Sequence, residues 1–136
     1  PLFRALNDKH YEAARMLLAA GAGVDGVTTS SWTALAISIQ SGDLELIKAI
    51  TDRGADPYAT APNGWTAFHM AVFGGFTDIA DYLLTLPGVT INKPMSDGWA
   101  PIHQASADGK PEMLAYVLAQ KDVDVNLATP QEQTGL

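Results

Sequence analysis

The chain has 136 residues, enough for one domain, and 47% of them are hydrophobic, so it can bury a core. Its 15 acidic and 8 basic residues give a net charge of −7, which argues against nucleic acid as the main partner and permits a protein partner with a basic patch. The absence of cysteine excludes disulfide scaffolds and cysteine-based zinc sites, and no apolar run approaches the roughly 18 residues of a membrane span.

One phrase recurs along the chain at a nearly constant spacing. Its equivalent residues are 33, 33, 34 and 34 positions apart, at Pro1, Ala34, Ala67, Pro101 and Gly135. All three tryptophans occupy the same point of this phrase, shortly before the equivalent residue. A fixed period of this length indicates a repeat protein, in which each unit is one supersecondary motif.

The register divides a single domain, residues 1–136, into units. A partial unit opens the chain, three fuller units follow, and the start of a further one closes it: about 1–27, 28–60, 61–94, 95–127 and 128–136. Neither end looks like the polar cap that a repeat array needs. We therefore expect a piece of a longer array.

Each unit is predicted to contain two short helices. In the third unit the first helix opens at Thr66, whose hydroxyl can cap a backbone N–H, and ends at Gly75, which takes a left-handed conformation without strain. The second helix is predicted over residues 77–85, with an apolar stripe at Ile79, Ala80, Leu83 and Leu84. In the fourth unit Pro111 falls in the first turn of the second helix, where proline is tolerated.

A helix pair of this length cannot bury its apolar face alone, but it can do so when stacked on copies of itself. The links between pairs contain Asn63-Gly64 and Asp97-Gly98, dipeptides that favour tight hairpin turns. The sequence therefore predicts an all-α solenoid of stacked helix-turn-helix units joined by β-hairpin loops.

The period and one six-residue phrase together resemble the ankyrin repeat, whose signature is T-P-L-H-x-A. The matching stretches are Thr66-Ala67-Phe68-His69-Met70-Ala71 and Ala100-Pro101-Ile102-His103-Gln104-Ala105, and the resemblance covers the whole chain. It implies that His69 and His103 tie the loop to neighbouring backbone. Lys9 departs from the pattern, because it stands where the glycine that ends a first helix is usual.

No catalytic constellation is recognisable in the sequence. It has no cysteine nucleophile, no G-x-S-x-G and no phosphate-binding loop. His69 and His103 lie in adjacent units, too far apart to share a metal ion, and His10 is expected at an exposed helix start. We expect no enzyme activity, no metal and no cofactor.

The resemblance implies a concave binding face made of hairpin tips and first helices. Trp32, Trp65 and Trp99 would form a ladder along it, which either anchors a partner or stiffens the hairpins. Phe73 either packs on Trp65 or waits for a ligand. The candidate partner-binding residues are Trp32, Trp65, Trp99, Met70, Phe73, Gln40, Asn63, Asp97 and Asp108.

The predicted function is that of a protein–protein interaction module that binds through the concave face. The alternative is a regulatory or targeting appendage of an enzyme domain in the same full-length chain. We expect a monomer with an intracellular location, cytoplasmic or nuclear. The resemblance also implies hydroxylation of asparagines near unit ends, which match Asn92 and Asn126, although a hydrogen-bonding turn residue is the simpler interpretation.

Overall fold

The computed structural model describes residues 1–24, 26, 32–61, 64–87, 89–92, 98–107, 109 and 111–120. Over these residues the chain forms eight helices, namely α1 (Leu2–Asn7), α2 (Tyr11–Ala19), α3 (Ala34–Ile39), α4 (Leu44–Asp52), α5 (Ala67–Gly74), α6 (Thr77–Thr85), α7 (Pro101–Ala107) and α8 (Pro111–Leu118). No strand is formed within these ranges. The predicted all-α class is therefore confirmed, and α6 has the bounds that the apolar stripe predicted.

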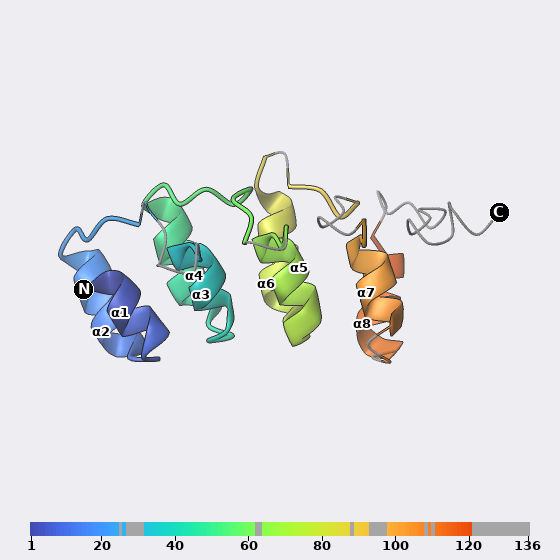
Figure 1. The fold of residues 1–136 in the computed structure, drawn as a ribbon, viewed down its shortest axis with the longest axis horizontal. Helices are drawn as coiled ribbons and strands as arrows, with labels where there is room; N and C mark the ends of the chain where they lie inside the picture. The colour runs from blue at the N-terminus through green and yellow to red at the C-terminus, as the bar shows by residue number, and fades with distance from the viewer. Residues whose placement is uncertain are drawn as a thin grey trace.

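The helices are arranged as pairs that stand side by side in chain order (Figure 1). Within each pair the two helices pack on one another, as in α1 with α2 and α7 with α8. The first helices also contact each other in sequence, α1 with α3, α3 with α5 and α5 with α7, whereas α2, α4 and α6 form a second row. This two-layered stack is the predicted solenoid.

The first helices α3 and α5 begin at threonine caps. Thr33 accepts the Ala36 N–H at 3.1 Å, and the Thr66 hydroxyl accepts the His69 N–H while His69 Nδ1 accepts the Thr66 N–H. In the next unit Nδ1 of the equivalent histidine, His103, accepts the backbone N–H of the residue that precedes the helix at 3.0 Å. These bonds satisfy amides that a helix start leaves without partners, and they confirm that the histidines tie loop to backbone.

The first helices end in a left-handed turn. Gly75 takes this conformation directly after α5, with φ of 76°, and Gly42 and Gly109 have φ of 69° and 63° after α3 and α7. Lys9 holds the same conformation after α1, with φ of 61°. The backbone therefore keeps its path where the sequence departs from the glycine pattern, and a residue with a Cβ adopts a conformation that costs about 1 kcal/mol or more.

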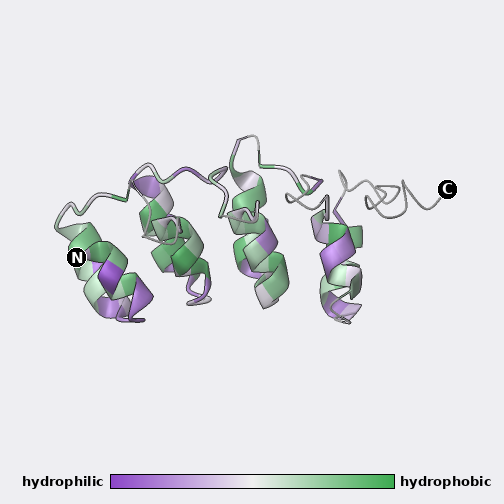
Figure 2. Cartoon of the chain, in the orientation of Figure 1, coloured by the Kyte–Doolittle hydropathy of each residue, from purple (hydrophilic) through white to green (hydrophobic). Residues whose placement is uncertain are grey.

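The core runs through the first helices of the central pairs. All six residues of α3 are buried, and six of the eight residues of α5 are buried. Each of these helices is covered by its own second helix and by first helices on both sides, so little of its surface faces water. Figure 2 shows the result as strongly hydrophobic helices in the two central pairs.

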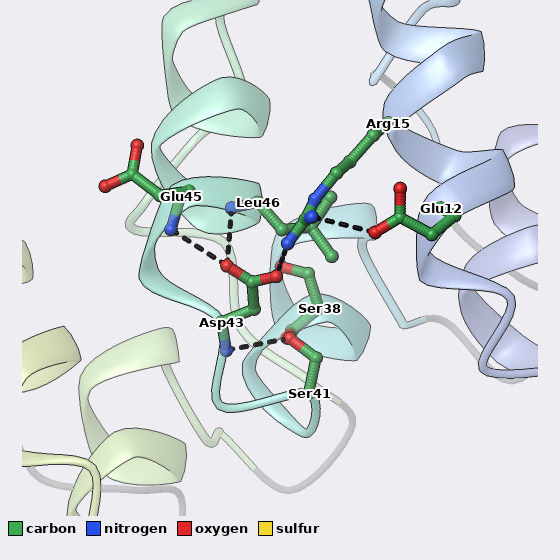
Figure 3. A network of polar contacts seen from close by, with 7 residues as sticks. All are labelled: Glu12, Arg15, Ser38, Ser41, Asp43, Glu45 and Leu46. Carbon is green, nitrogen blue, oxygen red and sulfur yellow. Dashed lines mark hydrogen bonds and ion pairs between the residues drawn. The ribbon is translucent and has the colours of Figure 1, made fainter.

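A polar network joins the first unit to the second (Figure 3). The Arg15 guanidinium on α2 forms ion pairs with Glu12, at 2.9 Å, and with the Asp43 carboxylate that precedes α4. The same carboxylate accepts the N–H groups of Glu45 and Leu46 at 3.1 and 3.2 Å. Asp43 therefore caps α4 and anchors the neighbouring helix with one side chain.

Tyrosines make the corresponding links further along the second row. The hydroxyls of Tyr82 on α6 and Thr51 on α4 are hydrogen-bonded at 2.5 Å. Tyr116 on α8 donates to Asp81 on α6 at 2.6 Å. Burial, helped by this hydrogen bond and by the negative charge of Asp81, raises the pKa of Tyr116 far above its ordinary value. Each successive pair of second helices thus carries a polar link between units.

Candidate functional site

An apolar groove lies between the first helices α3 and α5. Its volume is about 360 Å³, and the described residues that line it are Trp32, Ile39, Gln40, Trp65, Met70, Phe73, Gly74 and Phe76. The groove therefore brings together five of the predicted partner-binding residues: Trp32, Gln40, Trp65, Met70 and Phe73. Four of the lining side chains are aromatic rings that come from two successive units.

The exposed wall of the groove is a pair of rings. Phe73 packs edge-on against Trp65, with ring centroids 5.3 Å apart and planes at 72°. Phe73 still exposes 50% of its surface. Of the two interpretations that the sequence allowed, packing on Trp65 is confirmed, and contact with a ligand stays a prediction.

The floor of the groove is buried and apolar. Ile39 on α3 is 1% exposed and Met70 on α5 is 8% exposed. Met70 therefore supports the groove from below and offers little surface of its own, because its helix is packed between α3 and α7. Gln40, at the C-terminal end of α3, is exposed at the groove edge and brings an amide to an otherwise apolar lining.

The end of the groove next to the C-terminus of α5 is formed by Phe76 and two glycines. A Cβ on Gly74 would lie 2.5 Å from the Phe76 ring, and a Cβ on Gly42 would lie 2.9 Å from it. The ring can occupy this place only because both positions lack a side chain. Phe76 was not predicted as a site residue, and its position next to the helix-ending glycine was the one available signal.

The third tryptophan has different surroundings. Trp99 packs edge-on against His103, with ring centroids 6.2 Å apart, and it does not line the groove. In its unit Gln104 occupies the position that Met70 has in the preceding unit. Gln104 is 5% exposed, and its side-chain oxygen is buried without a hydrogen-bond partner among the described residues.

The remaining predicted residues are placed as follows. Asn63, Asp97, Asp108 and Asn126 lie outside the described residues. Asn92 lies in the turn after α6, half-buried, and its N–H donates to the Thr90 hydroxyl at 3.2 Å. The hydroxylation of Asn92 and Asn126 stays a prediction.

Metal-ligating clusters and membrane-spanning helices are absent from the described residues. No three His, Asp or Glu side chains among them gather closely enough to hold a metal ion. His69 is buried, whereas His10 is exposed at the start of α2, as predicted. None of the described helices has both the length and the apolar character needed to cross a membrane.

Comparison with known proteins identifies the repeat. A family model of three ankyrin repeats matches residues 39–129. Over 99 residues the chain is 32% identical to mouse (Mus musculus) protein phosphatase 1 regulatory subunit 27. The aligned region covers 73% of this chain and 64% of that protein. Over 53 residues it is 47% identical to zebrafish (Danio rerio) Notch-regulated ankyrin repeat-containing protein B, covering 39% of this chain and 48% of the relative.

The human protein phosphatase 1 regulatory subunit 27 is 36% identical over 81 residues, or 60% of this chain and 52% of that protein. The chain thus spans about half to two thirds of the length of these relatives. The family match and the stacked helix pairs agree in period, and the structure has the capping histidines at the positions that the repeat requires. The chain belongs to the ankyrin-repeat family.

Proposed function

We propose that this chain binds a protein partner through the groove between α3 and α5, on the face formed by the first helices. Ankyrin repeats are protein-interaction modules, and the groove gathers four aromatic rings and a methionine at one place. The observation that carries the proposal is the Phe73 ring, which leaves 50% of its surface exposed beside Trp65.

The composition of the groove supports a protein ligand. Aromatic residues and methionine are enriched in the centres of protein interfaces, and tryptophan is the residue most enriched in binding hot spots. Here the rings of Trp32, Trp65 and Phe73 come from a rigid stack, so little conformational entropy is lost when a partner orders them. The packing that stiffens the rings and the contact with a partner are compatible roles for the same side chains.

A second candidate is regulation or targeting of an enzyme, including one in the same full-length chain. The relative that matches 73% of this chain is named a regulatory subunit of a phosphatase. In either case the segment itself would bind and not catalyse. We propose a monomeric module of intracellular location, whose acidic charge suits a partner with a basic patch.

The test is affinity capture from a cell extract with the wild type and two variants. Phe73→Ala removes the exposed ring of the groove, and Tyr58→Ala removes a ring with similar exposure, 42%, elsewhere on the molecule. We expect proteins that the wild type and Tyr58→Ala retain to be lost with Phe73→Ala, while circular dichroism shows that all three are folded. Equal capture by Phe73→Ala would contradict the proposal.

A further inference from the structure

We propose that the groove takes up an arginine side chain from a basic segment of the partner. This inference rests on the proposed function, because it names the chemistry of the group that enters the same groove. The observations that lead to it are the kind of rings in the groove, the distribution of charge around it and the amide at its edge.

The first observation is the number of ring faces that meet at one place. Trp32, Trp65, Phe73 and Phe76 all line the groove, and Trp65 and Phe73 are held at 72° to each other. The face of an aromatic ring carries negative charge density, which attracts a cation, most strongly with tryptophan. Two rings at such an angle can contact one bound side chain with the face of one ring and the edge of the other.

The second observation is the absence of positive charge among the described residues that line the groove. Residues 54–92 contain no lysine and no arginine, and the whole chain has a net charge of −7. The two basic residues of the preceding unit, Lys48 and Arg53, lie on and just after α4, in the second row of helices. Lys48 lies 5.7 Å from the Tyr82 ring centroid and 3.8 Å from Glu45. A cation that enters the groove would therefore meet no like charge among the lining residues that the structure describes.

The third observation favours arginine over lysine. No carboxylate is found among the described residues that line the groove, so nothing there compensates for the loss of water around a strongly hydrated ammonium group. A guanidinium group is more weakly hydrated, is planar and stacks on aromatic faces. The Gln40 amide oxygen at the edge can accept one of its N–H groups, since the Gln40 side chain makes no hydrogen bond within the described structure.

The experiment follows the indole N–H signals of the three tryptophans by NMR in the ¹⁵N-labelled chain of 136 residues. The probes are four capped tripeptides, Gly-X-Gly, in which X is arginine, citrulline, lysine or leucine. Citrulline has nearly the same shape as arginine but no charge. We expect the arginine peptide to shift the signals of Trp32 and Trp65 and to bind at least threefold more tightly than the citrulline peptide. Trp99 lies outside the groove and serves as the internal reference.

Two alanine variants and one conservative variant locate the effect. Phe73→Ala is expected to weaken binding of the arginine peptide at least threefold, whereas Tyr58→Ala leaves it unchanged. Since both side chains are exposed, both variants should remain folded, and the dispersion of their NMR signals checks this. Phe73→Tyr, which keeps a ring, should restore binding.

The outcomes separate this inference from the proposed function. If leucine or citrulline shifts Trp32 and Trp65 as strongly as arginine, the groove is a docking site and the arginine assignment is wrong. If lysine binds more tightly than arginine, the assignment is likewise wrong. If no peptide shifts these signals, or if Trp99 shifts equally, the groove does not recognise arginine, and the capture experiment alone then decides the proposed function.

Discussion

Two successive steps of the stack can be compared, where a step is one first helix packed against the next: α3 with α5, and α5 with α7. The two steps share their backbone arrangement and differ in the side chains at their surface. At equivalent positions the first has Met70 and Phe73, and the second has Gln104 and Ala107. The first step is an aromatic groove with a buried apolar floor, and the second has a buried amide whose oxygen has no partner among the described residues. One residue at each of two positions therefore decides what a repeat step offers to a ligand.

The shared backbone has its own set of residues. His69 and His103 make the same bond to the N–H before the helix, although a threonine precedes one helix and Ala100 the other. The turns after α5 and α7 both use a glycine in the left-handed conformation. Because these positions build the stack, the side chains that line the face are able to differ from one unit to the next. The comparison can be tested by exchanging residues between the two steps.

The largest effect is expected from placing the amide in the aromatic step. Met70→Gln would bury a polar group without a partner and remove apolar burial, which should lower the free energy of unfolding by about 2–3 kcal/mol. Urea denaturation measures this change. Met16→Gln, at a methionine that is 73% exposed, is the matched control and should change stability by less than about 0.5 kcal/mol. A Met70→Gln variant as stable as its control would show that the floor of the groove tolerates polarity.

The reverse exchange should stabilise the chain. Gln104→Met removes the buried oxygen without a partner and adds apolar contact at the same register, so we expect a gain of about 1–2 kcal/mol in urea denaturation. A loss of stability would mean that the Gln104 amide makes a compensating interaction in solution, and the two steps would then differ less than their side chains suggest.

A third exchange would build a ring pair in the second step. Ala107 is exposed at the position of Phe73, so Ala107→Phe should place a ring near Trp99 as Phe73 lies near Trp65. We expect a gain of about 0.5–1 kcal/mol and a change in Trp99 fluorescence. Ala13→Phe, on the exposed face of α2, adds the same ring without this neighbour and should leave the fluorescence unchanged.

The smallest effect concerns the second row of helices, where the two steps are linked differently. Since the pKa of Tyr116 is raised by burial and by Asp81, the folded chain holds this proton more tightly than the unfolded chain does. Its contribution to stability is fully present below the ordinary tyrosine pKa of about 10 and is lost as the pH rises above it. Urea midpoints between about pH 9 and about pH 11 should fall more steeply for the wild type than for Tyr116→Phe. Tyr58→Phe, which removes a hydroxyl from an exposed ring, is the control, and parallel curves for all three would contradict the assignment.

Much of the fold could be predicted because it depends on local signals. The cap at Thr66, the helix over 77–85 and the left-handed turn at Gly75 follow from neighbouring residues and a constant period. Five residues were likewise named from their register and from the concave face that the family resemblance implies. All five line the groove: Trp32, Gln40, Trp65, Met70 and Phe73.

The rest of the site depends on tertiary packing. Phe76 enters the groove because Gly42, in the preceding unit, leaves room for its ring. The repeat register does not predict how close two residues of different units lie. Met70 is buried and Phe73 half exposed although both lie on α5, because α3 and α7 cover one more fully than the other. Trp99 shares the register of the other tryptophans, but its neighbour is His103 and not a phenylalanine.

The central claim is that the groove between α3 and α5 is the surface that meets a partner. The most direct measurement replaces Phe73 by the photo-crosslinking amino acid p-benzoylphenylalanine, which preserves an aromatic ring at this half-exposed position. The same replacement at Tyr58 is the matched control. On irradiation in a cell extract, we predict a covalent adduct with a protein partner at position 73 and none at position 58. Equal adducts at both positions, or an adduct at position 58 alone, would contradict the claim.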